Sequence, residues 1–165
     1  MALHLLIDGY NLLHQVPELS FLMLESPEEA RQALLEKLQT YQRLRRHKIT
    51  VVFDAWNDPE PRRKMNIKGI QVIFTAAGET ADDYLKRIAI KEKERAIVIT
   101  SDREIRSYVE TYGAISITSR DFLARLESAL YEDLKGETLG PQPPLNISKR
   151  LPKKVRRRLA KLAKL

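Results

Sequence analysis

The sequence of 165 residues contains no cysteine and no long hydrophobic run. Without cysteine, the chain has neither disulfide bonds nor thiolate metal ligands, a composition that suits a reducing cytoplasm. The first apolar run covers residues 3–7, includes His4, and ends at Asp8. It is too short for a membrane-spanning helix and lacks the pattern of a signal peptide. We therefore expect a cytoplasmic protein without a membrane partner.

Acidic residues are absent from the C-terminal part of the chain. All 22 of them lie at or before Glu137, whereas residues 149–165 carry nine lysines and arginines. Residues 1–148 contain 20 basic and 22 acidic residues, so the formal net charge of +7 comes from the basic tail. This division predicts one folded domain over residues 1–138, a proline-containing linker over 139–148 and a basic tail over 149–165.

Strand-like and helix-like patterns alternate along the domain. Short apolar runs predict five strands, at residues 3–7, 49–53, 70–74, 96–99 and 114–117. Ser26, Pro27 and Glu29 form a capping box that starts one helix. Further helices are expected from residue 79 or 80 to about 93, from 101 or 102 to about 113, and from 119 onward. Strands that are apolar on both faces and separated by helices predict an α/β fold with a mostly parallel sheet covered on both sides.

Acidic residues follow the predicted strands. Asp8 and Asp54 directly end the first two, Asp102 follows the fourth, and Asp82 and Asp83 lie in the helical turn after the third. Because the carboxyl ends of parallel strands share one edge of a sheet, we expect these acids to lie together. Each acid alone could be a turn or helix-capping residue. Four junctions with the same feature favour a shared site.

Carboxylates that converge repel one another and raise one another's pKa unless a cation neutralises them. Oxygen ligands without cysteine or paired histidine favour Mg²⁺ or Mn²⁺. Such ions activate water and stabilise the leaving oxygen in phosphodiester hydrolysis. The acidic edge therefore favours a nuclease.

Four sequence segments together resemble a known family. LLIDGYNLL, VVFDA, GETADDYL and VITSD, in this order within residues 3–135, resemble the YacP-like NYN branch of the PIN-domain nucleases. The resemblance implies a PIN-like (NYN) three-layer α/β/α fold and a ribonuclease that uses Mg²⁺ or Mn²⁺ and no small-molecule cofactor. It also implies cleavage that leaves a 5′-phosphate and a 3′-hydroxyl. We expect this cleavage to be endonucleolytic, although the sequence leaves exonucleolytic action open.

The same resemblance implies a role for each matching residue. Asn11 would hydrogen-bond a metal-bound water or a substrate phosphate. Because adjacent helical residues point in different directions, Asp82 and Asp83 cannot both point straight at one centre. The implied metal ligands and catalytic acids are Asp8, Asp82, Asp83 and Asp102. The implied supporting residues are Asp54, Glu79, Thr100 and Ser101.

Basic and aromatic side chains suggest how RNA would be held. The expected loop after Asp54 offers Trp56 for stacking on a base and Arg62, Arg63 and Lys64 for phosphates. In the tail, apolar residues recur at helical spacing and basic residues fill the other face. The tail residues expected to contact RNA are Lys153, Lys154, Arg156, Arg157 and Arg158. The expected partner is messenger RNA or a structured RNA such as that of a ribosome, although the apolar stripe of the tail could instead dock on the domain.

Two other classes of protein share parts of this pattern. A non-catalytic RNA-binding module of the same fold would use the acids as helix caps and bind RNA without metal. A Mg²⁺-dependent phosphatase with an aspartyl nucleophile normally has a second acid two residues after the first, where this chain has Tyr10. The combination of D-G-Y-N with A-D-D favours the nuclease.

Overall fold

The computed structural model describes residues 3–55, 63–136 and 152–165. The strands form one sheet in the order β3-β4-β2-β1-β5-β6, and every pairing is parallel except that of β3 with β4. The strands are β1 (His4–Asp8), β2 (Lys48–Phe53), β3 (Arg63–Ile67), β4 (Ile70–Phe74), β5 (Ala96–Ile99) and β6 (Ile115–Ile117). The helices are α1 (Gly9–Leu13), α2 (Pro17–Glu25), α3 (Pro27–Arg45), α4 (Ala81–Glu92), α5 (Arg103–Thr111), α6 (Ser119–Lys135) and α7 (Lys153–Leu162).

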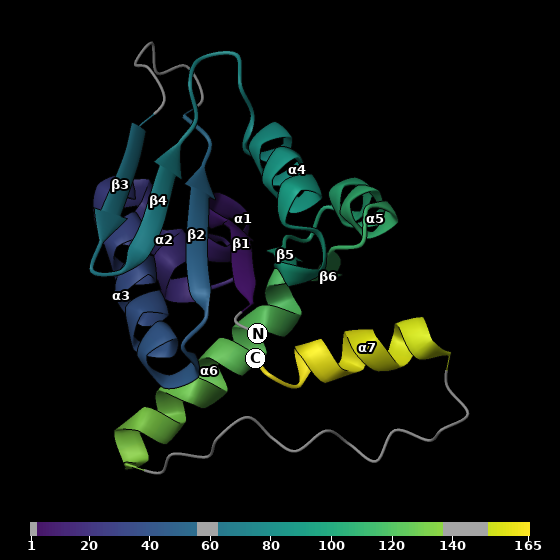
Figure 1. Cartoon of the computed structure of the whole chain (residues 1–165). Helices are drawn as coiled ribbons and strands as arrows, with labels where there is room; N and C mark the ends of the chain where they lie inside the picture. Colours follow the sequence, from purple (N-terminus) through teal and green to yellow (C-terminus); the bar gives the residue numbers. More distant parts are fainter. Residues whose placement is uncertain (1–2, 56–62, 137–151) are drawn as a thin grey trace.

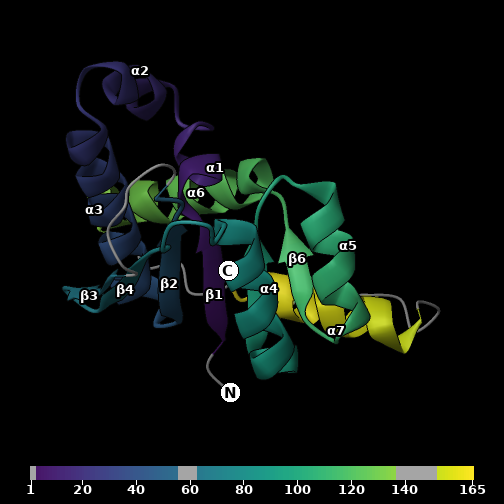
Figure 2. The same ribbon diagram turned by 90° about the horizontal axis from the view of Figure 1, so that it is seen from above.

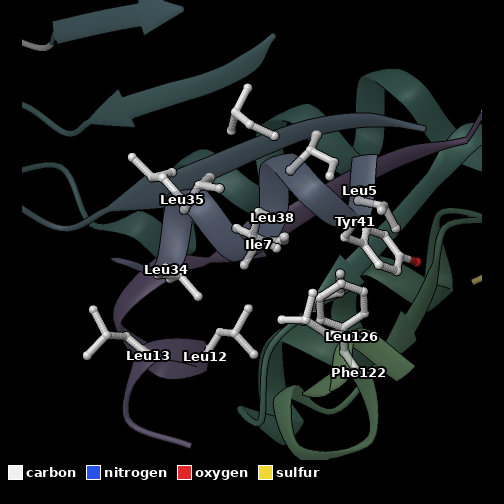
Figure 3. Packing of buried hydrophobic residues seen from close by; sticks show 14 of the residues in the cluster. Leu5, Ile7, Leu12, Leu13, Leu34, Leu35, Leu38, Tyr41, Phe122 and Leu126 are labelled. Atoms are coloured by element: carbon white, nitrogen blue, oxygen red, sulfur yellow. The ribbon is translucent and has the colours of Figure 1, made fainter. Parts of the chain in front are cut away.

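Helices cover both faces of the sheet, so the predicted three-layer α/β/α fold is confirmed (Figures 1 and 2). On one face, α1, α3 and α6 pack leucines and aromatic rings against the sheet. Figure 3 shows Leu12 and Leu34 on this face together with Tyr41 and Phe122. On the other face, α4 and α5 bury a smaller cluster that includes Leu85 and Ile105. Both faces are apolar, which is why the strands read as continuous hydrophobic runs.

Three elements have no counterpart among the predicted ones: α1, α2 and β3. The five residues of α1 are too few for a helical period, and α2 buries only Leu19. The residues of β3 are exposed or half-buried, since it is an edge strand, and its only apolar residues are Met65 and Ile67. The predicted loop over residues 54–66 is therefore wrong for residues 63–66, which belong to this strand.

Gly9 sets how closely α1 approaches β2. A Cβ atom at this position would lie 2.4 Å from a ring carbon of Phe53 and 3.0 Å from a methyl carbon of Val51. Both neighbours are completely buried and cannot move aside. We expect Gly9→Ala to lower the free energy of unfolding by about 1–3 kcal/mol, as overpacking does, and urea denaturation would measure the loss. A helical glycine without this close contact would instead become more stable on replacement by alanine.

The tail helix α7 docks on the domain, below the sheet in Figure 1. Arg158 forms an ion pair with Glu110 and donates to the Ser116 carbonyl at 2.9 Å. Further on, the Leu165 carbonyl accepts from the Tyr41 hydroxyl at 3.1 Å and from Arg45 Nε at 3.2 Å. Leu162 packs against the larger core cluster. Docking, one of the alternatives for the tail, therefore occurs, while Lys153, Lys154, Arg156 and Arg157 stay exposed.

The proposed linker over residues 139–148 and both of its boundaries lie outside the described residues, as does Leu151 near the start of the tail. Among the helices in the described part of the chain, none is long and apolar enough to cross a membrane.

Candidate active site

Asp8 and Asp102 are joined through one buried hydroxyl group. Asp8 ends β1, which lies in the middle of the sheet, and Thr100 follows the neighbouring strand β5. The Thr100 hydroxyl donates to Asp8 Oδ2 at 3.3 Å and accepts from the Asp102 backbone N–H at 3.2 Å. Thr100 is completely buried, so this bridge has a fixed position. It holds both acids at the same edge of the sheet.

Asp102 caps the N-terminus of α5. Its Oδ1 accepts from the backbone N–H groups of Glu104 at 2.9 Å and Ile105 at 3.4 Å. The helix-capping role considered for this residue is therefore real. It occupies one carboxylate oxygen and leaves the other for further contacts, so capping and a place in the site are compatible.

Asp82 and Asp83 differ in their surroundings. Thr80 caps α4 by accepting from the Asp83 backbone N–H at 3.1 Å, which places both acids in the first helical turn. Asp82 is half-buried, whereas Asp83 is exposed. Burial and the charges of Asp102 and Asp54 raise the pKa of Asp82, partly opposed by Lys86. Asp82 is thus the residue of the pair that faces the other acids.

The pKa of Asp8 is strongly raised by its surroundings. Burial, together with the charges of Asp82 and Asp54, raises its pKa to about 6, although hydrogen bonds from Thr100 and the Asn11 backbone favour the charged form. The charges of Asp82 and Asp54 thus act on Asp8, and those of Asp102 and Asp54 act on Asp82, so the structure brings these four acids together. We call these four residues the acidic cluster.

Asp54 of the acidic cluster and the nearby Glu79 hold the loops at the edge of the site. Asp54 Oδ1 accepts from the Thr75 hydroxyl at 3.5 Å, and the same hydroxyl accepts from the Ala55 N–H at 3.1 Å. Glu79 forms an ion pair with Arg87 at 2.8 Å and accepts from the Ala76 N–H at 3.5 Å. Glu79 thus holds the loop between β4 and α4, from which Asp82 is presented.

Asn11 connects three elements around the acidic cluster. Its Oδ1 accepts from the Ser101 backbone N–H at 2.8 Å and from the Ser119 hydroxyl at 2.5 Å. This differs from the implied contact with water or phosphate, because protein donors occupy the side-chain oxygen and leave its NH₂ group for a substrate. Asn11 orients the loop that carries Asp102, and Ser119 was not predicted as a member of this network.

The residues proposed to hold RNA after Asp54 do not form one loop. Trp56 and Arg62 lie outside the described residues. Arg63 and Lys64 are the first two residues of β3, so their side chains point to opposite faces of the sheet. Arg63 lies over the Phe74 ring at 4.8 Å, whereas Lys64 lines a pocket of about 350 Å³ beside β2 and β4. They cannot bind the same phosphate as neighbours in a loop would.

The donor set of the acidic cluster fits a hard divalent cation. It offers carboxylate oxygens, and burial together with mutual repulsion raises the pKa of Asp8 and Asp82, which a bound positive charge would oppose. Within the described residues, no three acidic or histidine side chains are already arranged as a metal-binding group. The residues fit the cation by chemistry and charge, and they would have to draw together around it.

Thr100 offers a direct test of this arrangement. We expect Thr100→Val to lower stability by about 1–3 kcal/mol, because the Asp102 N–H loses its acceptor. The pKa of Asp8 should rise further, since the lost hydrogen bond favoured the charged form. Any activity that needs ionised Asp8 should therefore require a higher pH, and a pH profile would measure the shift. Thr100→Ser should restore both properties, and an unchanged profile in Thr100→Val would contradict the bridge.

The fold and the acidic edge define a nuclease-like α/β protein of the NYN class. The family model of the YacP-like NYN domain matches residues 5–164, and the chain belongs to this family. The match includes the docked helix α7. The chain is similar to the uncharacterized protein YacP of Bacillus subtilis (strain 168), with 34% identity over 127 residues and 75% of each chain covered.

Two solved structures are similar to this fold. The crystal structure of Rae1 (YacP) from Bacillus subtilis matches with a TM-score of 0.69 and 32% identity, covering 82% of this chain and 79% of that chain. The crystal structure of a point mutant of the same protein also matches, with a TM-score of 0.69 and 30% identity. This match covers 82% of this chain and 80% of the mutant chain.

Proposed function

We propose that the protein is a metal-dependent ribonuclease of the cytoplasm that hydrolyses RNA phosphodiester bonds endonucleolytically. The observation that carries this proposal is the environment of Asp8. Its carboxyl group is buried beside Asp82 and Asp54, with a pKa of about 6. A protein keeps such a costly group where a positively charged ligand offsets the repulsion, and perturbed acids of this kind gather at functional sites.

Mg²⁺ or Mn²⁺ would be held by Asp8, Asp82 and Asp102, with exposed Asp83 as an outer contact. When bound, the ion would supply an activated water and stabilise the charge that develops on the phosphate. The remaining tasks belong to the protein. Thr100 fixes the distance between two of the ligands, and the Asn11 NH₂ group can donate to a phosphate oxygen. Asp54, Glu79 and Ser101 support the loops that present the ligands.

RNA binding would use basic groups on two sides of the domain. Arg63 lies near the carboxyl end of β4, whereas the exposed basic residues of α7 lie on a helix docked against other parts of the domain. Because phosphate contacts act through charge and are not sequence-specific, the tail would strengthen binding without taking part in cleavage. A large structured RNA, such as a ribosome carrying messenger RNA, has the dimensions to reach both regions.

Cleavage of a 5′-labelled RNA of mixed sequence tests the proposal. We expect cutting with Mg²⁺ or Mn²⁺, none with EDTA, and products that carry 5′-phosphates. Asp133→Asn is a suitable control, because it removes one negative charge on α6 from the ion pair with Arg43. Cutting that persists in EDTA would contradict metal dependence. If isolated RNA is bound but not cut, the next substrate for the same assay is messenger RNA held in ribosomes.

The second candidate is a non-catalytic RNA-binding module. It is favoured by one observation, that no three acids of the described residues already form a metal-binding group. Such a module would bind RNA equally well with and without cations and leave every substrate intact. The phosphatase has no comparable support, because Tyr10 packs on Phe53 at 5.0 Å between ring centroids and its hydroxyl accepts from Arg31.

A further inference from the structure

A row of aromatic rings lies next to the acidic cluster, on the α3 face of the sheet. Tyr10 packs on Phe53, and Phe53 stacks on Phe74 with 5.5 Å between ring centroids. In the chain, Tyr10 follows Asp8 by two residues, Phe53 directly precedes Asp54, and Phe74 ends β4. The row therefore runs along the same edge of the sheet as the acids.

Arg31 of α3 reaches this row from the side. One of its guanidinium nitrogens donates to the Tyr10 hydroxyl at 3.1 Å, and its guanidinium carbon lies 5.5 Å from the centre of the Phe74 ring. On the same ring, Arg63 of β3 lies at 4.8 Å. Two guanidinium groups from distant parts of the sequence thus converge on Phe74.

Arg31 is half-buried and has no carboxylate partner among the described residues, unlike Arg43 and Arg45 of the same helix. Its contacts with Tyr10 and Phe74 fix the plane of the guanidinium group while using only one of its five N–H donors. A guanidinium group held in this way is pre-organised for the oxygens of a phosphate. An acidic protein ligand would be repelled by the nearby acidic cluster, whereas RNA would approach it with its phosphates neutralised by cations.

We propose that Arg31, oriented by Tyr10 and Phe74, binds a backbone phosphate of the RNA on the α3 side of the acidic cluster, with Arg63 beside it. This inference rests on the proposed function, because it states where the RNA strand passes on its way to the acidic cluster. Arg31 binds the substrate at a distance from the reacting phosphate. It therefore contributes equally to the ground state and the transition state, and its loss raises KM and leaves kcat unchanged.

The test measures the affinity of single-stranded RNA in EDTA, where no cleavage occurs, over a series of KCl concentrations. Arg31→Met keeps the packing on Phe74 and removes the charge. We expect about tenfold weaker binding. In a plot of log binding constant against log salt concentration, the slope should become shallower by about 0.7, the value for one lost phosphate contact on a single strand. Arg31→Lys should keep the slope, and Arg43→Met, which removes a charge paired with Asp133, should behave as wild type.

A purely structural role would change the melting temperature without changing the salt slope. Arg31→Met with wild-type affinity and slope would overturn the inference, as would an equal loss of slope in Arg43→Met. If Arg31→Met does not fold, Tyr10→Phe replaces it. We expect Tyr10→Phe to weaken binding because Arg31 loses its orientation, and unchanged binding would contradict the proposal.

The outcomes separate this inference from the proposed function. Metal-dependent cleavage with an unaltered KM in Arg31→Met would refute the phosphate contact and leave the nuclease intact. RNA binding that depends on Arg31, without cleavage under any condition, would support the contact and refute the nuclease. A wild-type protein that does not bind RNA would overturn both.

Discussion

Asp8→Asn should abolish RNA cleavage and at the same time stabilise the protein. Removing a ligand that provides several kcal/mol of transition-state stabilisation lowers the rate on the order of 1,000-fold or more. The stability gain arises because asparagine keeps the shape of the side chain and carries no charge to be buried beside Asp82. Cleavage rates and urea denaturation in EDTA measure the two effects on the same preparations.

The sign of the stability effect follows from the pKa of Asp8. The folded protein holds the Asp8 proton up to a pH of about 6, whereas the unfolded chain releases it near the ordinary aspartate pKa of 3.8. Wild-type stability should therefore fall as the pH rises between these values, by about 3 kcal/mol when the carboxyl group is fully ionised. Asp8→Asn lacks this loss. Its advantage should be largest near about pH 7.5 and small near about pH 4, and an advantage independent of pH would contradict the assignment.

The Asp102 variants should separate catalysis from helix capping. Asp102→Asn keeps an oxygen that can accept from the N–H groups of α5, so its stability should stay close to wild type. Asp102→Ala loses the cap and should be destabilised by about 1 kcal/mol. Both variants should lose cleavage by a similar factor, on the order of 1,000-fold, because both lack the negative charge.

Thermal denaturation and cleavage assays on the two Asp102 variants provide the measurement. If Asp102→Asn is nearly fully active and only the less stable Asp102→Ala loses activity, the residue acts only as a helix cap. Asp133→Asn again controls for the general effect of removing one acid.

The parallel sheet and its acidic edge could be predicted because their signals are local. Apolar runs define the strands, and Asp8, Asp54 and Asp102 stand next to those runs in the sequence. Topology then brings their junctions together without any knowledge of distant contacts. The start of two helices is equally local, because the hydroxyl groups of Ser26 and Thr80 accept from backbone N–H groups three residues further on.

The features that were missed depend on contacts between distant residues. Arg31 meets Tyr10 across 21 positions, and Ser119 meets Asn11 across 108. Neither residue has a local pattern that distinguishes it from an ordinary helical arginine or serine. The edge strand β3 was missed because it is mostly exposed and has only two apolar residues, Met65 and Ile67, too few for a strand pattern. Sequence patterns thus locate the acids, while the groups that orient them and receive a substrate appear only in the folded structure.

The pKa of the Asp8 carboxyl group, measured by NMR titration without and with Mg²⁺, tests the proposed metal site most directly. We expect a pKa of about 6 in the cation-free protein, because burial and the charges of Asp82 and Asp54 oppose ionisation. Added Mg²⁺ should lower this pKa as it binds, and Asp102→Asn should weaken that response. An ordinary pKa for Asp8 without the cation, or a raised one that Mg²⁺ leaves unchanged, would contradict the claim that these acids gather to hold a metal ion.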